Sequence, residues 1–213
     1  MLTDSGPITT IAPPMPLMSS STKLHSILTP PAPTGPGDKI QWGNLYGSAL
    51  AAAVANAAKA HDSVTLVIVP DTASVDRLER DIGLFLEGVE QAPEVLRFAD
   101  WETLPYDTFS PHQDIISQRM RALYQLTLGR KSILIVAAQT LCQKIAPKSY
   151  IVANSLLLRV GERLELTGLR SQLAAAGYQS VDTVFQHGEF AVRGALLDIF
   201  PMGSEQAYRI ELF

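Results

Sequence analysis

Cysteine is almost absent from this chain, since Cys142 is the only one among 213 residues. A single thiol excludes an internal disulfide framework and a zinc site built on cysteine pairs. The four histidines do not show the spacing of metal ligands, so we expect no metal centre. They are His25, His61, His112 and His187. Cys142 follows a predicted buried strand and is expected to be an inert packing residue.

Long apolar runs are also missing, because no stretch approaches the roughly 18 residues of a membrane-spanning helix. The N-terminus lacks the basic and apolar regions of a signal peptide. The 17 Lys and Arg residues do not balance the 21 Asp and Glu residues, which gives a net charge of -4. A nucleic-acid clamp needs a basic footprint, so this function is disfavoured for the chain as a whole. We expect a cytoplasmic protein without membrane contact.

The composition divides the chain into three parts. Residues 1–37 are rich in Pro, Ser and Thr, and such a segment buries too little surface to offset its ordering entropy. They are predicted to be a flexible leader. Met18 precedes three serines and is compatible with a later native start, which mass spectrometry of the native N-terminus would test. Residues 38–152 and 153–213 are predicted to be two folded domains.

Three buried strands with intervening helices are predicted within residues 38–152. Continuous apolar runs favour a parallel sheet, and the alternation of strands and helices favours right-handed crossovers. The predicted fold class is therefore α/β, with a doubly wound parallel sheet. The strands are expected at 64–69, 95–98 and 133–136, after a helix at 49–60. The first crossover helix should bury Val75, Leu78, Ile82 and Phe85.

A polar, aromatic and proline-broken loop, DWETLPYDTFSPHQD at residues 100–114, leads into the last helix of this domain. We expect Ser110 to cap that helix, Pro111 to occupy its first position and Gln113 to complete a capping box. Gly129 should end it. Its buried face is expected to include Ile115, Ile116, Met120, Leu123, Tyr124 and Leu126.

Residues 153–213 have shorter strands with alternating polar and apolar positions. The pattern predicts a smaller α+β domain built on a hairpin or meander. A helix at 169–176 should be closed by Gly177. The chain stops inside the last predicted strand, so we expect this domain to be truncated. The strands are expected at 156–159, 183–186, 195–200 and 208–213.

A glycine-containing segment before the first helix resembles a phosphate-binding loop in position. Gly43 and Gly47 are present, but Leu50 takes the place of the lysine that binds phosphates, and Ala51 that of the hydroxyl that binds magnesium. Neither side chain offers a ligand to a phosphate or a metal. We therefore predict a degenerate loop, without a catalytic residue or a bound cofactor in this chain.

The loop at 100–114 first suggests an active-site rim, with Asp107 or Asp114 as an acid–base group. If the phosphate loop is degenerate and binds no nucleotide, these carboxylates have no catalytic role as acid or base. We therefore expect its aromatic residues Trp101, Tyr106 and Phe109 to seal the loop onto the sheet.

The last predicted strand has two different faces. Its period of two places Arg209, Glu211 and Phe213 on one side and mainly apolar residues on the other. Arg193 enters the preceding hairpin. Because arginine and aromatic residues dominate protein interfaces, Arg193, Arg209 and Phe213 predict a binding hot spot. The alternative is a solvated face with incidental Arg–Glu pairing.

Two long motifs resemble the transcription-repair coupling factor family, Mfd. They are DWETLPYDTFSPHQDIIS at residues 100–117 and HGEFAVRGALLDIFPMGSE at residues 187–205. The resemblance runs from about residue 30 to the end, and in outline it extends to the N-terminal half of the excision-repair protein UvrB. It implies a degenerate helicase-like first domain followed by a UvrA-binding α+β domain.

The family's UvrA-contacting positions fall on Arg193, Arg209 and Phe213, while the resemblance implies a mainly structural role for Asp198. The loop at 101–114 is shorter than its UvrB counterpart, which implies that it lacks the hairpin that probes damaged DNA. An ATP- and magnesium-dependent translocase motor, with the contacts to RNA polymerase and DNA, would lie beyond residue 213.

Three functions follow as hypotheses. The first is a non-enzymatic module that mimics UvrB and binds UvrA, recruiting nucleotide excision repair to stalled RNA polymerase. The second is a UvrB-like ATP-dependent enzyme that processes DNA damage, which requires nucleotide binding at Gly47. The third is an autoinhibitory surface that packs on the motor of the intact protein, and it is compatible with the first.

Overall fold

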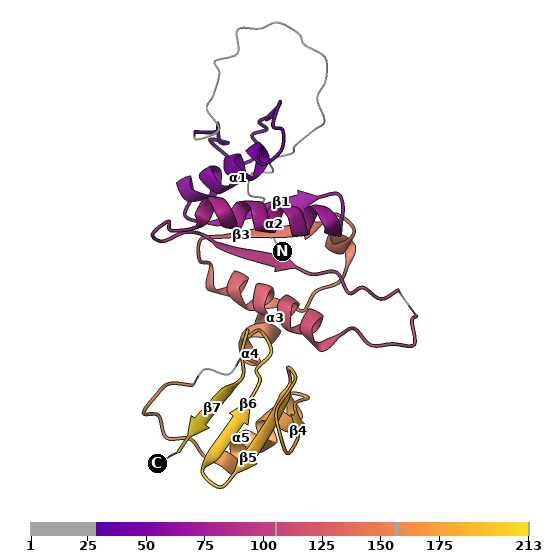
Figure 1. Cartoon of the computed structure of the whole chain (residues 1–213), viewed down its shortest axis with the longest axis vertical. Helices are drawn as coiled ribbons and strands as arrows, with labels where there is room; N and C mark the ends of the chain where they lie inside the picture. Colours follow the sequence, from indigo (N-terminus) through magenta and orange to yellow (C-terminus); the bar gives the residue numbers. More distant parts are fainter. Residues whose placement is uncertain (1–28, 105, 156–157, 213) are drawn as a thin grey trace, which may run out of the picture.

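The computed structural model describes residues 29–104, 106–155 and 158–212. The described elements form a three-stranded parallel sheet and a separate four-stranded sheet, each with its own helices (Figure 1). The predicted α/β class is confirmed. Several sequence predictions lie outside the described residues: most of the leader with Met18, the start of the strand expected at 156–159, and Phe213.

The first sheet contains β1 (Val64–Val69), β2 (Glu94–Phe98) and β3 (Ser132–Ala137), in the order β1-β3-β2. The chain leaves β1 through helix α2 (Thr72–Leu86) and returns from β2 to the central strand through α3 (Gln113–Leu128). The two crossovers run in opposite directions across the sheet. Because both are expected to be right-handed, they place α2 and α3 on opposite faces.

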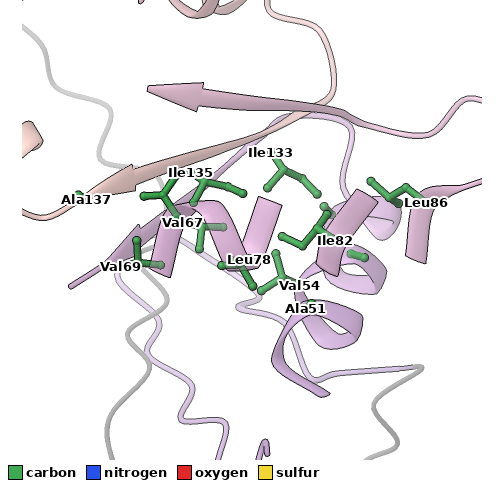
Figure 2. Packing of buried hydrophobic residues seen from close by; sticks show 13 residues of the cluster. Ala51, Val54, Val67, Val69, Leu78, Ile82, Leu86, Ile133, Ile135 and Ala137 are labelled. Atoms are coloured by element: carbon green, nitrogen blue, oxygen red, sulfur yellow. The ribbon is translucent and has the colours of Figure 1, made fainter. Parts of the chain in front are cut away.

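The larger core lies between the sheet and the helix pair α1 (Ala49–Ala60) and α2 (Figure 2). Alanines such as Ala51 and Ala55 let α1 approach α2 closely, because their small side chains leave room for the two helix backbones to lie near each other. Ile82 of α2 and Ile133 and Ile135 of β3 are completely buried. Leu86 is buried in the same cluster, whereas Phe85 is exposed, so the predicted burial of Phe85 is wrong.

The start of α3 differs from the sequence prediction. The helix begins at Gln113 rather than beside Ser110, and His112 is its cap, with the Nδ1 atom accepting a hydrogen bond from the Asp114 backbone N–H. The buried residues of α3 are Ser117, Arg119 and Ala122. The six apolar residues expected there are only partly buried, and two of them, Leu123 and Leu126, pack against the buried residues of β2 and β3. Gly129 ends the helix in a left-handed conformation, as predicted.

The second sheet has the order β4-β5-β6-β7 and is covered by α5 (Leu166–Ala175). Strands β5 to β7 form the predicted antiparallel meander, and β4 lies parallel to β5. The strand expected at 183–186 is absent, because the backbone N–H groups of Phe185 and Gln186 donate to the Glu189 carboxylate. The strands are β4 (Gln179–Ser180), β5 (Glu189–Arg193), β6 (Leu196–Ile199) and β7 (Tyr208–Glu211).

Polar contacts join α3 to the second sheet. The Nδ1 atom of His187 lies 2.8 Å from an Asp114 carboxylate oxygen, and its Nε2 atom lies 2.9 Å from the Ser204 carbonyl oxygen. Arg121 forms an ion pair with Glu205 of the same loop. The two sheets are therefore held together by charged and hydrogen-bonded groups, while each keeps its own apolar core.

Gly203 lies at this junction and permits a test of it. Its N–H donates to the Ser117 hydroxyl, and a methyl group on its Cα would lie 3.4 Å from the backbone of Arg121. Gly203 and Gly194 both have positive φ angles, but a methyl group at Gly194 would meet no atom within 4 Å. We expect Gly203→Ala to lower the free energy of unfolding by up to about 1 kcal/mol more than Gly194→Ala, because only the methyl group at Gly203 would meet a neighbouring backbone, at the short limit of van der Waals contact. Urea denaturation measures both, and equal losses would show that the contact is not kept in solution.

Candidate functional site

Three neighbouring strands bring two arginines onto one aspartate. Arg193 ends β5, Asp198 lies in the middle of β6, and Arg209 lies opposite Asp198 on β7. The Arg209 Nε and Nη2 atoms donate to the two Asp198 carboxylate oxygens at 2.6 and 2.9 Å. The Arg193 Nη2 atom donates to Asp198 Oδ2 at 3.2 Å. We call these three residues the arginine face.

Asp198 points away from the core of its sheet. Its neighbours Leu197 and Ile199 are 0% and 5% exposed and pack against α5, so the alternation along β6 turns Asp198 to the opposite side. The Asp198 side chain is 15% exposed, against 55% for Arg193 and 57% for Arg209. The carboxylate therefore sits at the base of the arginine face, with the guanidinium groups open to solvent.

Charge pairing stabilises this arrangement. Hydrogen bonds from Arg209 hold the pKa of Asp198 below its usual value, and the charges of Arg209 and Arg193 act in the same direction. The same hydrogen bonds raise the pKa of Arg209. Asp198 and Arg209 are consequently ionised at neutral pH, and the two exposed guanidinium groups of the arginine face are suited to bind carboxylates of another molecule.

The structure brings together two of the three residues of the predicted hot spot. Arg193 and Arg209 share one carboxylate, whereas Phe213 lies outside the described residues. Ile210 packs on the core of the second sheet, but Tyr208, expected on the same side, is exposed. The arginines pair directly with an aspartate, not with a glutamate.

The segment that resembles a phosphate-binding loop leads into α1. Leu50 is partly buried against the larger core and Ala51 is 1% exposed, so both side chains serve packing. Gly47 has a positive φ angle of 56°, while Gly43 is exposed and carries no such conformation. The absence of nucleotide binding by this segment remains a prediction.

Comparisons with known proteins point to the same family as the motifs at residues 100–117 and 187–205. Residues 156–213, which carry the arginine face, match the UvrB interaction domain. The chain is 46% identical over 181 residues to the transcription-repair-coupling factor of Escherichia coli K12, covering 85% of this chain and 15% of that protein. It is 45% identical over 184 residues to the transcription-repair-coupling factor of Haemophilus influenzae, which covers 86% of this chain and 16% of that protein. This chain is a homologue of the transcription-repair-coupling factors.

The resemblance stated from the two sequence motifs is thereby confirmed. A more distant relative, the transcription-repair-coupling factor of Myxococcus xanthus, is 31% identical over 180 residues, which cover 83% of this chain and 15% of the relative. The chain thus spans about 15% of the length of these coupling factors.

One motif shared with the coupling-factor family contains a loop that is anchored by a buried arginine. Arg119 of α3 is 3% exposed and its guanidinium carbon lies 4.1 Å from the Phe98 ring centre and 3.9 Å from that of Trp101. It donates to the Ala99 carbonyl at 2.6 Å and to the Gln143 side chain at 2.9 Å. Burial lowers the pKa of Arg119, and the charge of a nearby carboxylate opposes that shift. No sequence motif singles out this residue, because an arginine in a helix is usually exposed.

The tip of the same loop is exposed, contrary to expectation. Trp101 packs on Arg119, but Tyr106 and Phe109 are 104% and 78% exposed. The loop extends beyond the carboxyl end of β2 (Figure 1), and Glu102 and Tyr106 in it adopt positive φ angles. The predicted seal is therefore correct for Trp101 and wrong for the other two aromatic residues.

The structure also locates the remaining candidate groups. Cys142 ends the short helix η1 (Thr140–Cys142) and is exposed, so its predicted burial is wrong. Asp114 pairs with His187 at the junction between the two sheets. Across the described part of the chain, no group of three His, Cys, Asp or Glu residues is arranged to hold a metal ion. The described helices include none that is both long and apolar enough to cross a membrane.

Proposed function

We propose that this segment is a protein-interaction module that binds UvrA and thereby recruits nucleotide excision repair to stalled RNA polymerase. The observation that carries the proposal is the arginine face, in which two exposed guanidinium groups are held side by side on one carboxylate. It lies within the residues that match the UvrB interaction domain. The resemblance of the motif at 187–205 to the coupling-factor family supports UvrA as the partner.

The module acts in this proposal as a non-enzymatic mimic of UvrB in the cytoplasm. The packing of Leu50 and Ala51 into the first domain supports the absence of ATP hydrolysis, because these positions offer no ligand for phosphate or magnesium. ATP, magnesium, DNA and RNA polymerase would be bound by other parts of a longer protein, since the chain spans about 15% of its relatives.

UvrA binding tests the proposal directly. In the full-length protein, Arg193→Ala, Arg209→Ala and Phe213→Ala are each expected to weaken UvrA binding by about 1–3 kcal/mol, the usual range for interface anchors. Isothermal titration calorimetry with purified UvrA measures the change. Arg170→Ala is the matched control, because Arg170 is exposed on α5, on the other side of the second sheet, and should leave the affinity unchanged. Undiminished affinity for all three variants would reject the site.

A further inference from the structure

We propose that Asp198 is the positioning residue of the arginine face: it holds Arg193 and Arg209 so that their free N–H groups bind acidic side chains of the partner. This inference rests on the proposed function and adds both a residue and the chemistry of the partner surface. The resemblance to the coupling-factor family by itself implies a mainly structural role for Asp198.

The backbone makes Asp198 a rigid support. Strand β6 is hydrogen-bonded to β5 on one side and to β7 on the other, so Asp198 lies in the central strand of the meander. Leu197 and Ile199 fix the strand to the core below. The carboxylate therefore has a defined place, from which it contacts one arginine of each neighbouring strand.

The carboxylate leaves much of each guanidinium group available. A guanidinium group has five N–H donors, and Asp198 accepts two from Arg209 and one from Arg193. The planar group keeps a second edge, whose geometry matches a carboxylate. With both side chains more than half exposed, the free edges are accessible to a partner that carries Asp or Glu at its surface.

Ordering the arginines before contact favours binding. A free arginine loses rotamer entropy when a partner immobilises it, and a side chain that is already held loses less. Asp198 also removes positive charge from the face, which opposes attraction of an acidic partner. The two effects predict opposite results for Asp198→Asn: positioning predicts weaker binding, and charge alone predicts tighter binding.

Titration of the full-length protein with UvrA separates these effects. We expect Asp198→Asn and Asp198→Ala to lower the affinity about tenfold, a coupling typical of directly bonded side chains. Asp198→Glu keeps the carboxylate and should restore most of the affinity. The matched control is Glu211→Gln, which neutralises a carboxylate two residues from Arg209 that forms no hydrogen bond with it in the described structure. Unchanged or tighter binding by Asp198→Asn would overturn the inference.

A double-mutant cycle distinguishes positioning from a general effect on the fold. In a protein that already carries Arg193→Ala and Arg209→Ala, Asp198→Asn should cause no further loss, because no guanidinium group remains to be held. An equal loss in that background would assign Asp198 to the fold and reject positioning. If the two arginine substitutions themselves leave UvrA binding intact, the proposed function fails. If they weaken binding while Asp198→Asn does not, only the role of Asp198 is rejected.

Discussion

Ile135→Ala is expected to lower the free energy of unfolding of the first domain by about 2–5 kcal/mol. Ile135 lies in the central strand β3, is fully buried and faces the helix pair α1 and α2 (Figure 2). Its neighbours on the adjacent strands are Val67 and Arg97. Because both flanking strands and the helices are already in place, little of the structure can move to fill the cavity. Urea denaturation followed by circular dichroism measures the loss.

Ile68→Ala is the matched control for this substitution. Ile68 lies on the edge strand β1, is 48% exposed and points away from the core between the sheet and α1 and α2, in which its neighbours Val67 and Val69 are buried. The same change from isoleucine to alanine should therefore cost less than about 1 kcal/mol. Similar losses for Ile68→Ala and Ile135→Ala would contradict the assignment of the core to the face covered by α1 and α2.

Arg119→Met is expected to lower the free energy of unfolding by about 2–4 kcal/mol, because hydrogen bonds from a charged donor are strong and unpaired buried acceptors are costly. The substitution keeps an unbranched side chain between Phe98 and Trp101 but removes the donors to the Ala99 carbonyl and the Gln143 side chain. Trp101 should become more exposed, so its fluorescence emission should shift to longer wavelength in the folded protein. Fluorescence and chemical denaturation measure the two effects.

The control for this experiment is Arg130→Met, at an exposed position two residues after the end of α3. It should leave stability and emission nearly unchanged. Since Arg119 lies on α3, outside the second sheet and its arginine face, its replacement should also leave UvrA binding intact as long as the second domain stays folded. A stable Arg119→Met protein with unchanged emission would show that Arg119 does not anchor the loop at 100–114.

Local patterns in the sequence predicted most of the elements. The run at 64–69 matches β1 because it is short and rich in β-branched residues, and the run at 49–60 matches α1 because it is longer and rich in alanine. Gly129 was predictable as a helix end because its left-handed conformation favours glycine. The start of α3 was mispredicted because Ser110 and His112 both suit a cap, and sequence alone does not rank them.

Exposure was harder to predict than secondary structure. Tyr106 and Phe109 are aromatic, and the sequence predicted that they would be buried against the sheet. Their exposure depends on the backbone path of the loop, which extends beyond the carboxyl end of β2 and has positive φ angles at Glu102 and Tyr106. Arg119 shows the reverse case, since a charged residue is buried where two rings and two acceptors surround it.

The sequence by itself determined the α/β class, the parallel and antiparallel strand groups and the family, because these depend on local periodicity and on contiguous motifs. It also led to the prediction, still untested, that Arg193 and Arg209 are binding residues. Only the tertiary structure placed both on Asp198, because that contact depends on the register of three strands. It likewise decided the pairing of Asp114 with His187 across 73 residues, since the sequence contains no signal for which distant segments meet.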